Sequence, residues 1–189
     1  MGNKIIISEI KCAEESSQVT LDGEIEPGDF YNFDNGQLVE KLGEPLDVLF
    51  LDYKKEYEIF KNNRYSHSIP FLDSEKEKAL AKGRKLEARE VFVFNFLLLR
   101  EIKEKKSCPY FMVFKGAQLP VGRDLENFYK RLTFNERPFF DIVIEINRKK
   151  REGKNYFFFQ KTWKEKRIVS TEEKTIAEKW INYLEDESA

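Results

Sequence analysis

Short apolar runs rich in Phe, Ile, Val and Tyr recur along this chain, and their order constrains its fold more than any other feature. Their residues alternate or cluster over short stretches, which is typical of β-strands. The stretch 28–38 contains the turn sequence Asp34-Asn35-Gly36 and predicts a small hairpin. The runs that predict strands are 4–10, 46–60, 90–102, 109–116, 139–147 and 156–163. The chain is therefore expected to be mainly β.

A few other stretches favour helices. Residues 122–132 place their apolar side chains at helical spacing and so predict one apolar face. Near the end of the chain, Ser170 and Glu173 form a capping box before a second apolar stripe. This pattern predicts an amphipathic helix over 170–184, followed by a short acidic end, 185–189. The stretch that begins at Asp73 is so charged that it predicts a marginal helix or a mobile loop.

From residue 46 onward, the predicted order is three strands, one helix and two strands. This is the order of the OB-fold, a five-stranded Greek-key barrel. We therefore predict one OB-fold-like domain over residues 1–169, in which an N-terminal β extension precedes the barrel, with the C-terminal helix docked on it. A generic α+β sheet with the same order is the alternative.

The charges of this chain are segregated, although their total is close to zero. The chain has 33 basic and 34 acidic residues, yet nine basic and two acidic residues fall between 148 and 167. A basic segment in a nearly neutral chain favours a local surface for a polyanion. The sequence contains no run that predicts a signal peptide or a membrane span, so a soluble, cytoplasmic protein is expected, in the host cytoplasm if it is viral.

The turn predicted between the last two barrel strands has the sequence NRKKREGKN. Cations on such a hairpin can follow a phosphate backbone and gain affinity by releasing counterions. A solvated tip that protects the sheet edge from aggregation is the alternative. The cations predicted to contact phosphates are Arg148, Lys149, Lys150, Arg151, Lys154 and, on the following strand, Lys161.

The strand after this turn is rich in aromatic residues. By alternation Phe159, Lys161 and Trp163 share one face. We expect 156–159 to anchor the barrel wall, and Lys161 and Trp163 to lie on an open surface, because proteins that bind single strands combine aromatic planes for bases with cations for phosphates. The first barrel strand interleaves the same residue types. We therefore include three of its residues in the predicted site, namely Tyr53, Lys55 and Tyr57.

Carboxylates at two places could hold a metal ion. Asp34 followed by Asp52-Tyr53-Lys54 resembles an arrangement that some nucleases use, and Asp141 and Glu145 could bind Mg²⁺ from one side of a strand. Charged residues make up 35% of the chain, so such spacings arise by chance. A metal-dependent nuclease is therefore the less favoured alternative.

Nucleophiles and metal-binding side chains are few. The only histidine, His67, lies in a polar stretch beside two serines, and Cys12 and Cys108 are too few for a cysteine-based zinc site. Nucleotide-binding loops and the common hydrolase motifs do not occur in the sequence. We expect no catalytic residue, no metal and no cofactor.

Several of these segments together resemble a known family, the phage-type single-stranded DNA-binding proteins built on an OB-fold. The likeness covers roughly residues 24–165. It lies in GDFYN with the later LG, in LDVLFLDYKKEYEIF, FVFNFLLL and PYFMVFKG with the helix GRDLENFY, and in PFFDIVIEI with NYFFFQKTW. The resemblance implies sequence-independent binding of single-stranded DNA in replication or recombination, without catalysis or metal.

The resemblance also implies partners. Replication or recombination proteins would contact the acidic end 185–189, although this end is short and follows a helix rather than a glycine-rich linker. Basic residues between the first two barrel strands, with Arg84 and Lys85 among them, would close over the bound DNA. A homodimer is compatible with the family, and no membrane is expected. The other alternative is a protein-interaction or structural module of a phage or mobile element.

Overall fold

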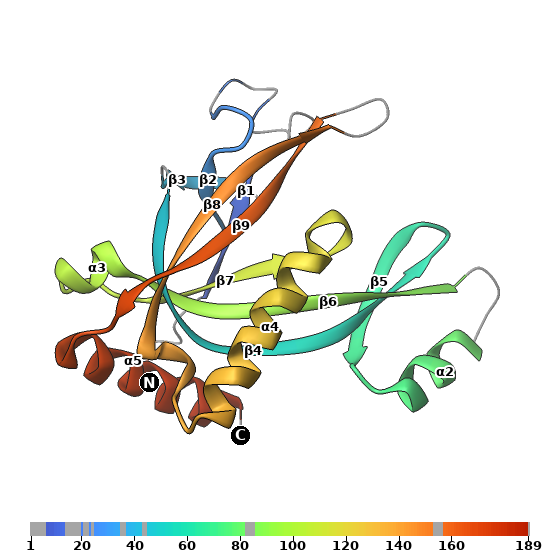
Figure 1. The fold of residues 1–189 in the computed structure, drawn as a ribbon. Helices are drawn as coiled ribbons and strands as arrows, with labels where there is room; N and C mark the ends of the chain where they lie inside the picture. The colour runs from blue at the N-terminus through green and yellow to red at the C-terminus, as the bar shows by residue number, and fades with distance from the viewer. Residues whose placement is uncertain are drawn as a thin grey trace, which may run out of the picture.

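The molecule is built on one curled sheet, with the helices packed around it (Figure 1). The computed structural model describes residues 7–13, 20, 23, 25–34, 37–42, 45–81, 86–152 and 157–188. Within these ranges the sheet has nine strands in the order β3-β2-β1-β7-β6-β4-β8-β9, with β5 paired to β4. The strands are β1 (Ser8–Cys12), β2 (Phe30–Asp34), β3 (Gln37–Lys41), β4 (Leu46–Lys61), β5 (Arg64–Pro70), β6 (Leu86–Leu98), β7 (Pro109–Phe114), β8 (Ile142–Glu152) and β9 (Phe157–Ile168).

Four helices lie within the described ranges. They are α2 (Asp73–Ala81), α3 (Leu99–Lys103), α4 (Leu119–Phe134) and α5 (Thr171–Ser188), with single 3₁₀ turns η1 (Gly116–Gln118) and η2 (Phe139–Asp141). The predictions of a mainly β chain and of a C-terminal helix are confirmed. α5 runs to Ser188, so the acidic residues from 185 continue this helix instead of forming a separate end. In the described part of the chain, no helix is both long and apolar enough to cross a membrane.

The strand number differs from the predicted five-stranded barrel with its N-terminal extension. β1, β2 and β3 form that extension, and β2 and β3 pair as the predicted hairpin. β5 is an additional strand, paired with β4 from Lys61↔Arg64 to Glu56↔Pro70. Its turn is formed by Asn62 and Asn63, both at positive φ (52° and 64°), the conformation that a tight two-residue hairpin requires.

β4 is the centre of the half-barrel. It pairs with β6 from Val48↔Leu98 to Lys61↔Leu86, and its first residues pair with β8. β7 continues the sheet beyond β6, and β9 continues it beyond β8. Among the described residues no hydrogen-bonded ladder joins β7 to β9, so the curled sheet has an open seam between these two strands.

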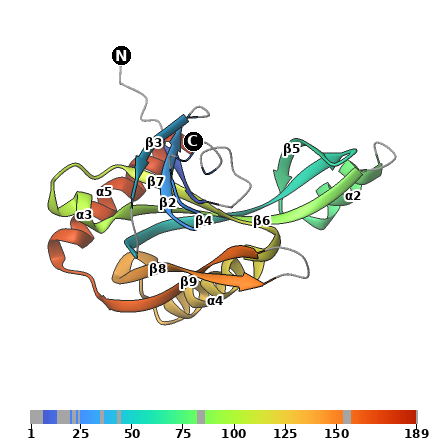
Figure 2. The same ribbon diagram turned by 90° about the horizontal axis from the view of Figure 1, so that it is seen from above.

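Alternation along the strands gives the sheet two apolar faces. The inner face carries Phe92, Phe94 and Phe96, all completely buried, and packs against α4 through Leu125 and Phe128. The outer face packs against α5 at one end of the sheet, where the buried cluster contains Leu49, Leu97, Ala177 and Leu184. Figure 2 shows α4 and α5 on opposite sides of β4 and β6.

Candidate nucleic-acid interface

The side chain of Gln118 bridges the seam between β7 and β9. Its amide nitrogen donates to the Phe159 carbonyl at 2.6 Å, and its amide oxygen accepts from the Lys161 backbone N–H at 2.7 Å. A primary amide has both a donor and an acceptor, as a peptide group does. Gln118 therefore pairs with β9 in the place where a neighbouring strand would do so.

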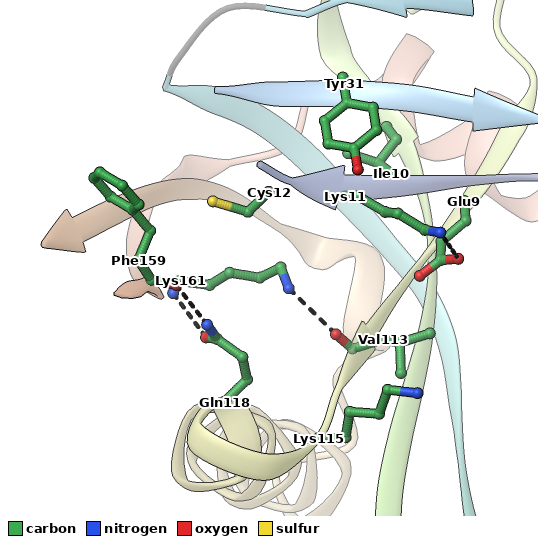
Figure 3. A pocket seen from close by; sticks show the side chains of 10 residues that line it. All are labelled: Glu9, Ile10, Lys11, Cys12, Tyr31, Val113, Lys115, Gln118, Phe159 and Lys161. Atoms are coloured by element: carbon green, nitrogen blue, oxygen red, sulfur yellow. Dashed lines mark hydrogen bonds and ion pairs between the residues drawn. The ribbon is translucent and has the colours of Figure 1, made fainter. Parts of the chain in front are cut away.

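A pocket of about 340 Å³ opens beside this bridge (Figure 3). It lies between β1, β7 and β9, segments that are far apart in the sequence. We name it the seam pocket. Its lining residues are Glu9, Ile10, Lys11, Cys12, Tyr31, Val113, Lys115, Gln118, Phe159 and Lys161.

Positive charge dominates the seam pocket, since three lysines and one carboxylate line it. Lys11 lies 3.4 Å from Glu9, and the exposed Lys115 pairs at 2.9 Å with Glu58 on β4. Lys161 is only 7% exposed, and its ammonium donates to the Val113 carbonyl at 3.3 Å. A concave site in which cations outnumber carboxylates attracts anions, so the pocket is suited to an anionic ligand.

Phe159 is the aromatic residue that β9 contributes to this pocket, and the segment around Gly28 packs against its ring. Gly28 has φ of +94°, and a Cβ atom there would lie 2.8 Å from the Phe159 ring and 2.7 Å from the Arg148 guanidinium. Arg148 lies over the same ring, with 5.5 Å from its guanidinium carbon to the ring centroid. Glycine at this position therefore permits a close contact that holds Phe159 in place.

Asp29, which follows Gly28 in the chain, holds Arg148 in place. Its carboxylate accepts from Arg148 at 3.2 Å and pairs with Lys41 at 2.5 Å. Burial raises the pKa of Asp29, but the hydrogen bonds from Lys41, the Glu26 N–H and Arg148 outweigh it, so that the pKa lies below its usual value. Asp29 therefore remains ionised at neutral pH and keeps Arg148 beside the pocket.

The β8–β9 hairpin extends the basic surface away from the pocket. Lys149, Lys150 and Arg151 are exposed at the end of β8, as the sequence predicts. In the register, Lys150 is opposite Phe159, so it shares a face with the pocket. Figure 1 shows this hairpin projecting from the body of the molecule. Lys154 lies outside the described residues.

The predicted division of β9 into a buried start and an open end is wrong. Trp163 is half-buried and packs on Phe128 of α4, with ring centroids 5.1 Å apart, while Lys161 is buried. In the register Trp163 is opposite Ile146, so alternation directs it at the apolar inner face beneath α4. Phe159, which the sequence assigns to the barrel wall, is also half-buried, but it lines the seam pocket.

Tyr53 and Lys55 on β4 also lie on the inner face rather than on an open surface. Tyr53 stacks on Phe94 at 5.3 Å and donates to Glu126 at 3.4 Å. Burial, with Glu126 nearby, raises the pKa of Tyr53 to about 12. Lys55 lies 3.4 Å from Glu90 and 3.5 Å from Glu126. α4 contributes Glu126 and covers both side chains, which were predicted to contact nucleic acid.

The prediction for Tyr57 needs the same correction. Tyr57 is 6% exposed, stacks on Phe71 at 4.4 Å and donates to Asp73 at 3.4 Å. The segment from β5 to α2 covers it, so in this structure Tyr57 offers no ring face to a base. Arg84 and Lys85 lie outside the described residues.

The carboxylates considered for a metal site have other partners. Asp52 accepts from Asn95 at 2.6 Å, and burial raises its pKa. Asp141 pairs with Arg137 at 3.3 Å, and Glu145 pairs with Lys164 at 2.9 Å. In the ranges that the structure describes, no group of three His, Cys, Asp or Glu side chains is placed to hold a metal ion. The structure does not describe the side chain of Asp34.

A second hollow, of about 620 Å³, lies on the outer face beside the end of α5. Ile7, Val93, Phe111 and Leu184 give it apolar walls, and its charged lining residues are Asp52, Lys54 and Glu56. Lys54 is paired with Glu56 at 2.8 Å. The larger hollow is thus less suited to a polyanion than the seam pocket.

Sequence reasoning missed Lys11, Lys115, Gln118 and Phe159 as members of one site. No local pattern predicts their proximity, because they come from β1, from the residue after β7, from η1 and from β9. The only sequence feature that pointed to this site was Gly28, which lies within GDFYN, one of the segments that carry the family resemblance. Comparisons of the chain with protein-family models, curated proteins and solved structures found no match.

Proposed function

We propose that this protein is a non-enzymatic, sequence-independent single-stranded DNA-binding protein. The observation that carries the proposal is the seam pocket, where three lysines and Phe159 meet beside the exposed cations 149–151. Proteins that bind single strands combine a basic groove for the backbone with aromatic rings on which bases stack. The seam pocket and the β8–β9 hairpin together offer both.

The strand order supports an OB-fold as the finer description of the half-barrel. β4, β6, β7, α4, β8 and β9 follow one another in that fold's order, and the pairs β4·β6, β6·β7, β4·β8 and β8·β9 are formed. OB-folds are partly open barrels, and the loop between their last two strands contacts oligonucleotides. Here the Gln118 bridge takes the place of the closing pair, and the basic hairpin is that last loop.

Each side chain has a distinct proposed role. Lys11, Lys115 and the cations 149–151 contact phosphates, and Phe159 stacks on a base. Lys161 lies at the base of the pocket and positions β9 through its bond to the Val113 carbonyl. The role in replication or recombination rests on the family resemblance alone.

Binding of labelled oligo-dT, followed by fluorescence anisotropy at two salt concentrations, tests the proposal. We expect tighter binding to oligo-dT than to duplex of equal length, with affinity that falls steeply as salt rises. Equal affinity for duplex would overturn the proposal. Cleavage of the oligonucleotide that requires Mg²⁺ and that Asp52→Ala abolishes would favour the nuclease instead.

Two variants that remove the same charge test whether the β8–β9 hairpin is part of the binding surface. Replacing Lys149, Lys150 and Arg151 with Ala should weaken binding and reduce the salt slope by about 2, since each lost phosphate contact on a single strand removes roughly 0.7. The control replaces three exposed lysines on or next to α3 and α5, namely Lys103, Lys106 and Lys179. It removes the same charge, and we expect it to leave the slope unchanged.

The two cysteines provide an independent probe. Cys12 lines the seam pocket, whereas Cys108 lies in another hollow beside Glu101. In a Cys108→Ser variant, oligo-dT should slow the alkylation of Cys12. In a Cys12→Ser variant, it should leave the alkylation rate of Cys108 unchanged. Equal protection of both thiols would argue against a local site at the seam.

A further inference from the structure

A hairpin and a short helix project from the sheet as an arm, on the right in Figure 1. The arm consists of β4 from Glu56, β5, α2 and β6 as far as Glu90. It has its own apolar cluster, in which Tyr57, Ile59 and Ala79 are buried. Together with the tight turn at 62–63, this cluster makes the arm a packed unit. The stretch from Asp73, predicted as a marginal helix or a mobile loop, begins with the helix α2.

The outer face of the arm presents an aromatic ring to solvent. Tyr65 is 58% exposed, and its ring meets that of Phe60 edge-on, with centroids 6.2 Å apart. The guanidinium of Arg89 lies 4.2 Å from the centroid of the Phe60 ring. Such edge-on and cation–π contacts hold aromatic rings in defined positions. Tyr65 is therefore exposed but supported from below.

This face is continuous with the seam pocket. Lys115 lines the pocket and pairs with Glu58 of β4 at 2.9 Å, and Glu58 is opposite Arg89 in the register. Phe60 follows Glu58 on the same face of β4 and is opposite Tyr65. The path from Lys115 to Tyr65 crosses three strand spacings, about 15 Å, and also runs from the level of Glu56 to that of Phe60 along β4, roughly 13 Å.

We infer that a DNA strand held in the seam pocket continues over this face and stacks a base on Tyr65. The inference rests on the proposed function. It names a second contact, remote from the pocket, that lengthens the binding site. A stacking contact accepts any base, which agrees with sequence-independent binding.

The charges of this face predict how the second contact behaves in salt. Glu87 pairs with Arg89 at 2.9 Å, and Glu58 pairs with Lys115, so the carboxylates beside the path are neutralised by cations. The contact on Tyr65 therefore depends on stacking rather than on phosphate charge. Its loss should weaken binding without changing the salt slope, unlike the loss of the hairpin cations.

The test compares two lengths of oligo-dT, about 8 and about 20 nucleotides, within the range of site sizes of such domains. Tyr65→Ala should leave the affinity for the short oligonucleotide unchanged and weaken the long one roughly fivefold or more. Tyr65→Phe keeps the ring and should bind both as the unmodified protein does. Leu72→Ala removes a side chain that is 56% exposed at the start of α2 and should also change neither affinity.

Each other outcome has a separate meaning. If Tyr65→Ala binds the long oligonucleotide normally, or weakens both lengths equally, the second contact is overturned while the seam pocket stands. If the unmodified protein binds neither length, the proposed function itself fails, and this inference fails with it.

Discussion

The same residue pattern occurs in two strands of this protein and has opposite surroundings in each. β4 interleaves Tyr53, Lys55 and Tyr57, and β9 interleaves Phe159, Lys161 and Trp163. On β4, α4 and the arm cover the whole pattern. On β9, α4 covers only the end at Trp163, while the start borders the seam pocket. An alternation of aromatic and basic residues therefore predicts two different faces but not which of them is covered.

Two lysines, Lys55 and Lys115, show the same contrast. Lys55 pairs with both Glu90 and Glu126. Its ammonium also lies over the rings of Phe71 and Phe92, 4.0 Å and 4.9 Å from their centroids. Lys115 at the seam pairs with one carboxylate and remains 54% exposed. Only the second arrangement leaves a lysine accessible to an incoming phosphate.

Two tyrosines of the arm offer the largest test of this contrast. Tyr57→Ala should lower the free energy of unfolding by roughly 3 kcal/mol, because removing a buried aromatic ring leaves a cavity. Tyr65→Ala should change it by less than about 0.5 kcal/mol, since its ring is exposed. Urea unfolding measures both. Equal losses would contradict the assignment of Tyr57 to the core and Tyr65 to the surface.

Gln118→Ala tests how the seam is held together. It removes both hydrogen bonds to β9 and leaves the Lys161 N–H and the Phe159 carbonyl without them, so we expect a loss of about 2 kcal/mol. Oligo-dT affinity should fall as well, because Phe159 lines the pocket. Gln160→Ala is the neighbouring control, since its 3.3 Å bond to the Ala117 carbonyl and its 2.9 Å bond from Arg151 are both exposed. A similar loss in both variants would argue against the bridge.

The acid dependence of stability tests the attachment of α5. Hydrogen bonds from Arg167, at 2.6 and 2.8 Å, outweigh burial and, with those from Ser170, lower the pKa of Glu173 from 4.5 to about 2. Because the pKa is lowered in the folded state, this stabilisation is present above pH 4.5 and is lost as the pH falls toward 2. Arg167 is 41% exposed, so screening reduces the contribution to about 1–2 kcal/mol at pH 7.

Comparison with Glu173→Gln measures this contribution. The free energy of unfolding of the unmodified protein should exceed that of the variant at pH 7, and the two should converge as the pH approaches 2. A constant difference across this range would contradict the role of the ion pair.

Lys11→Ala should have the smallest effect. Its ammonium lies near Glu9 at the surface, so unfolding should change by less than about 0.5 kcal/mol. If Lys11 contacts a phosphate in the seam pocket, the salt slope for oligo-dT should fall by about 0.7. Lys179→Ala serves as the control on α5. An unchanged slope in Lys11→Ala would remove this residue from the interface.

Local structure was largely predictable from the sequence. The apolar periodicity of 122–132 predicted α4, and every strand-like run overlaps a strand, although the end of the run 90–102 belongs to α3. The capping box is present as predicted, because the Glu173 carboxylate accepts from the Ser170 N–H at 2.8 Å and the Ser170 hydroxyl accepts from the Glu173 N–H at 3.3 Å. These features depend on residues a few positions apart. The turn Asn62-Asn63 was equally local, and its positive-φ preference could have revealed β5.

The candidate site was predictable only in part. The exposure of the basic hairpin could be predicted from the sequence, because charged residues at a turn between two strands usually lie at the surface. The seam pocket could not, since Lys11, Lys115 and Phe159 come together only when the sheet curls and Gln118 bridges β7 to β9.

The sequence by itself determined the strands, the helices and the two-sidedness of each strand, because alternation and capping act between near neighbours. The tertiary structure alone decided which side is covered. α4 and the arm cover the aromatic and basic residues of β4, whereas no ladder joins β7 to β9 in the described part of the chain, so that Phe159 borders a pocket there. The physical reason is that burial depends on which distant element packs on a face, and alternation within one strand contains no information about that element.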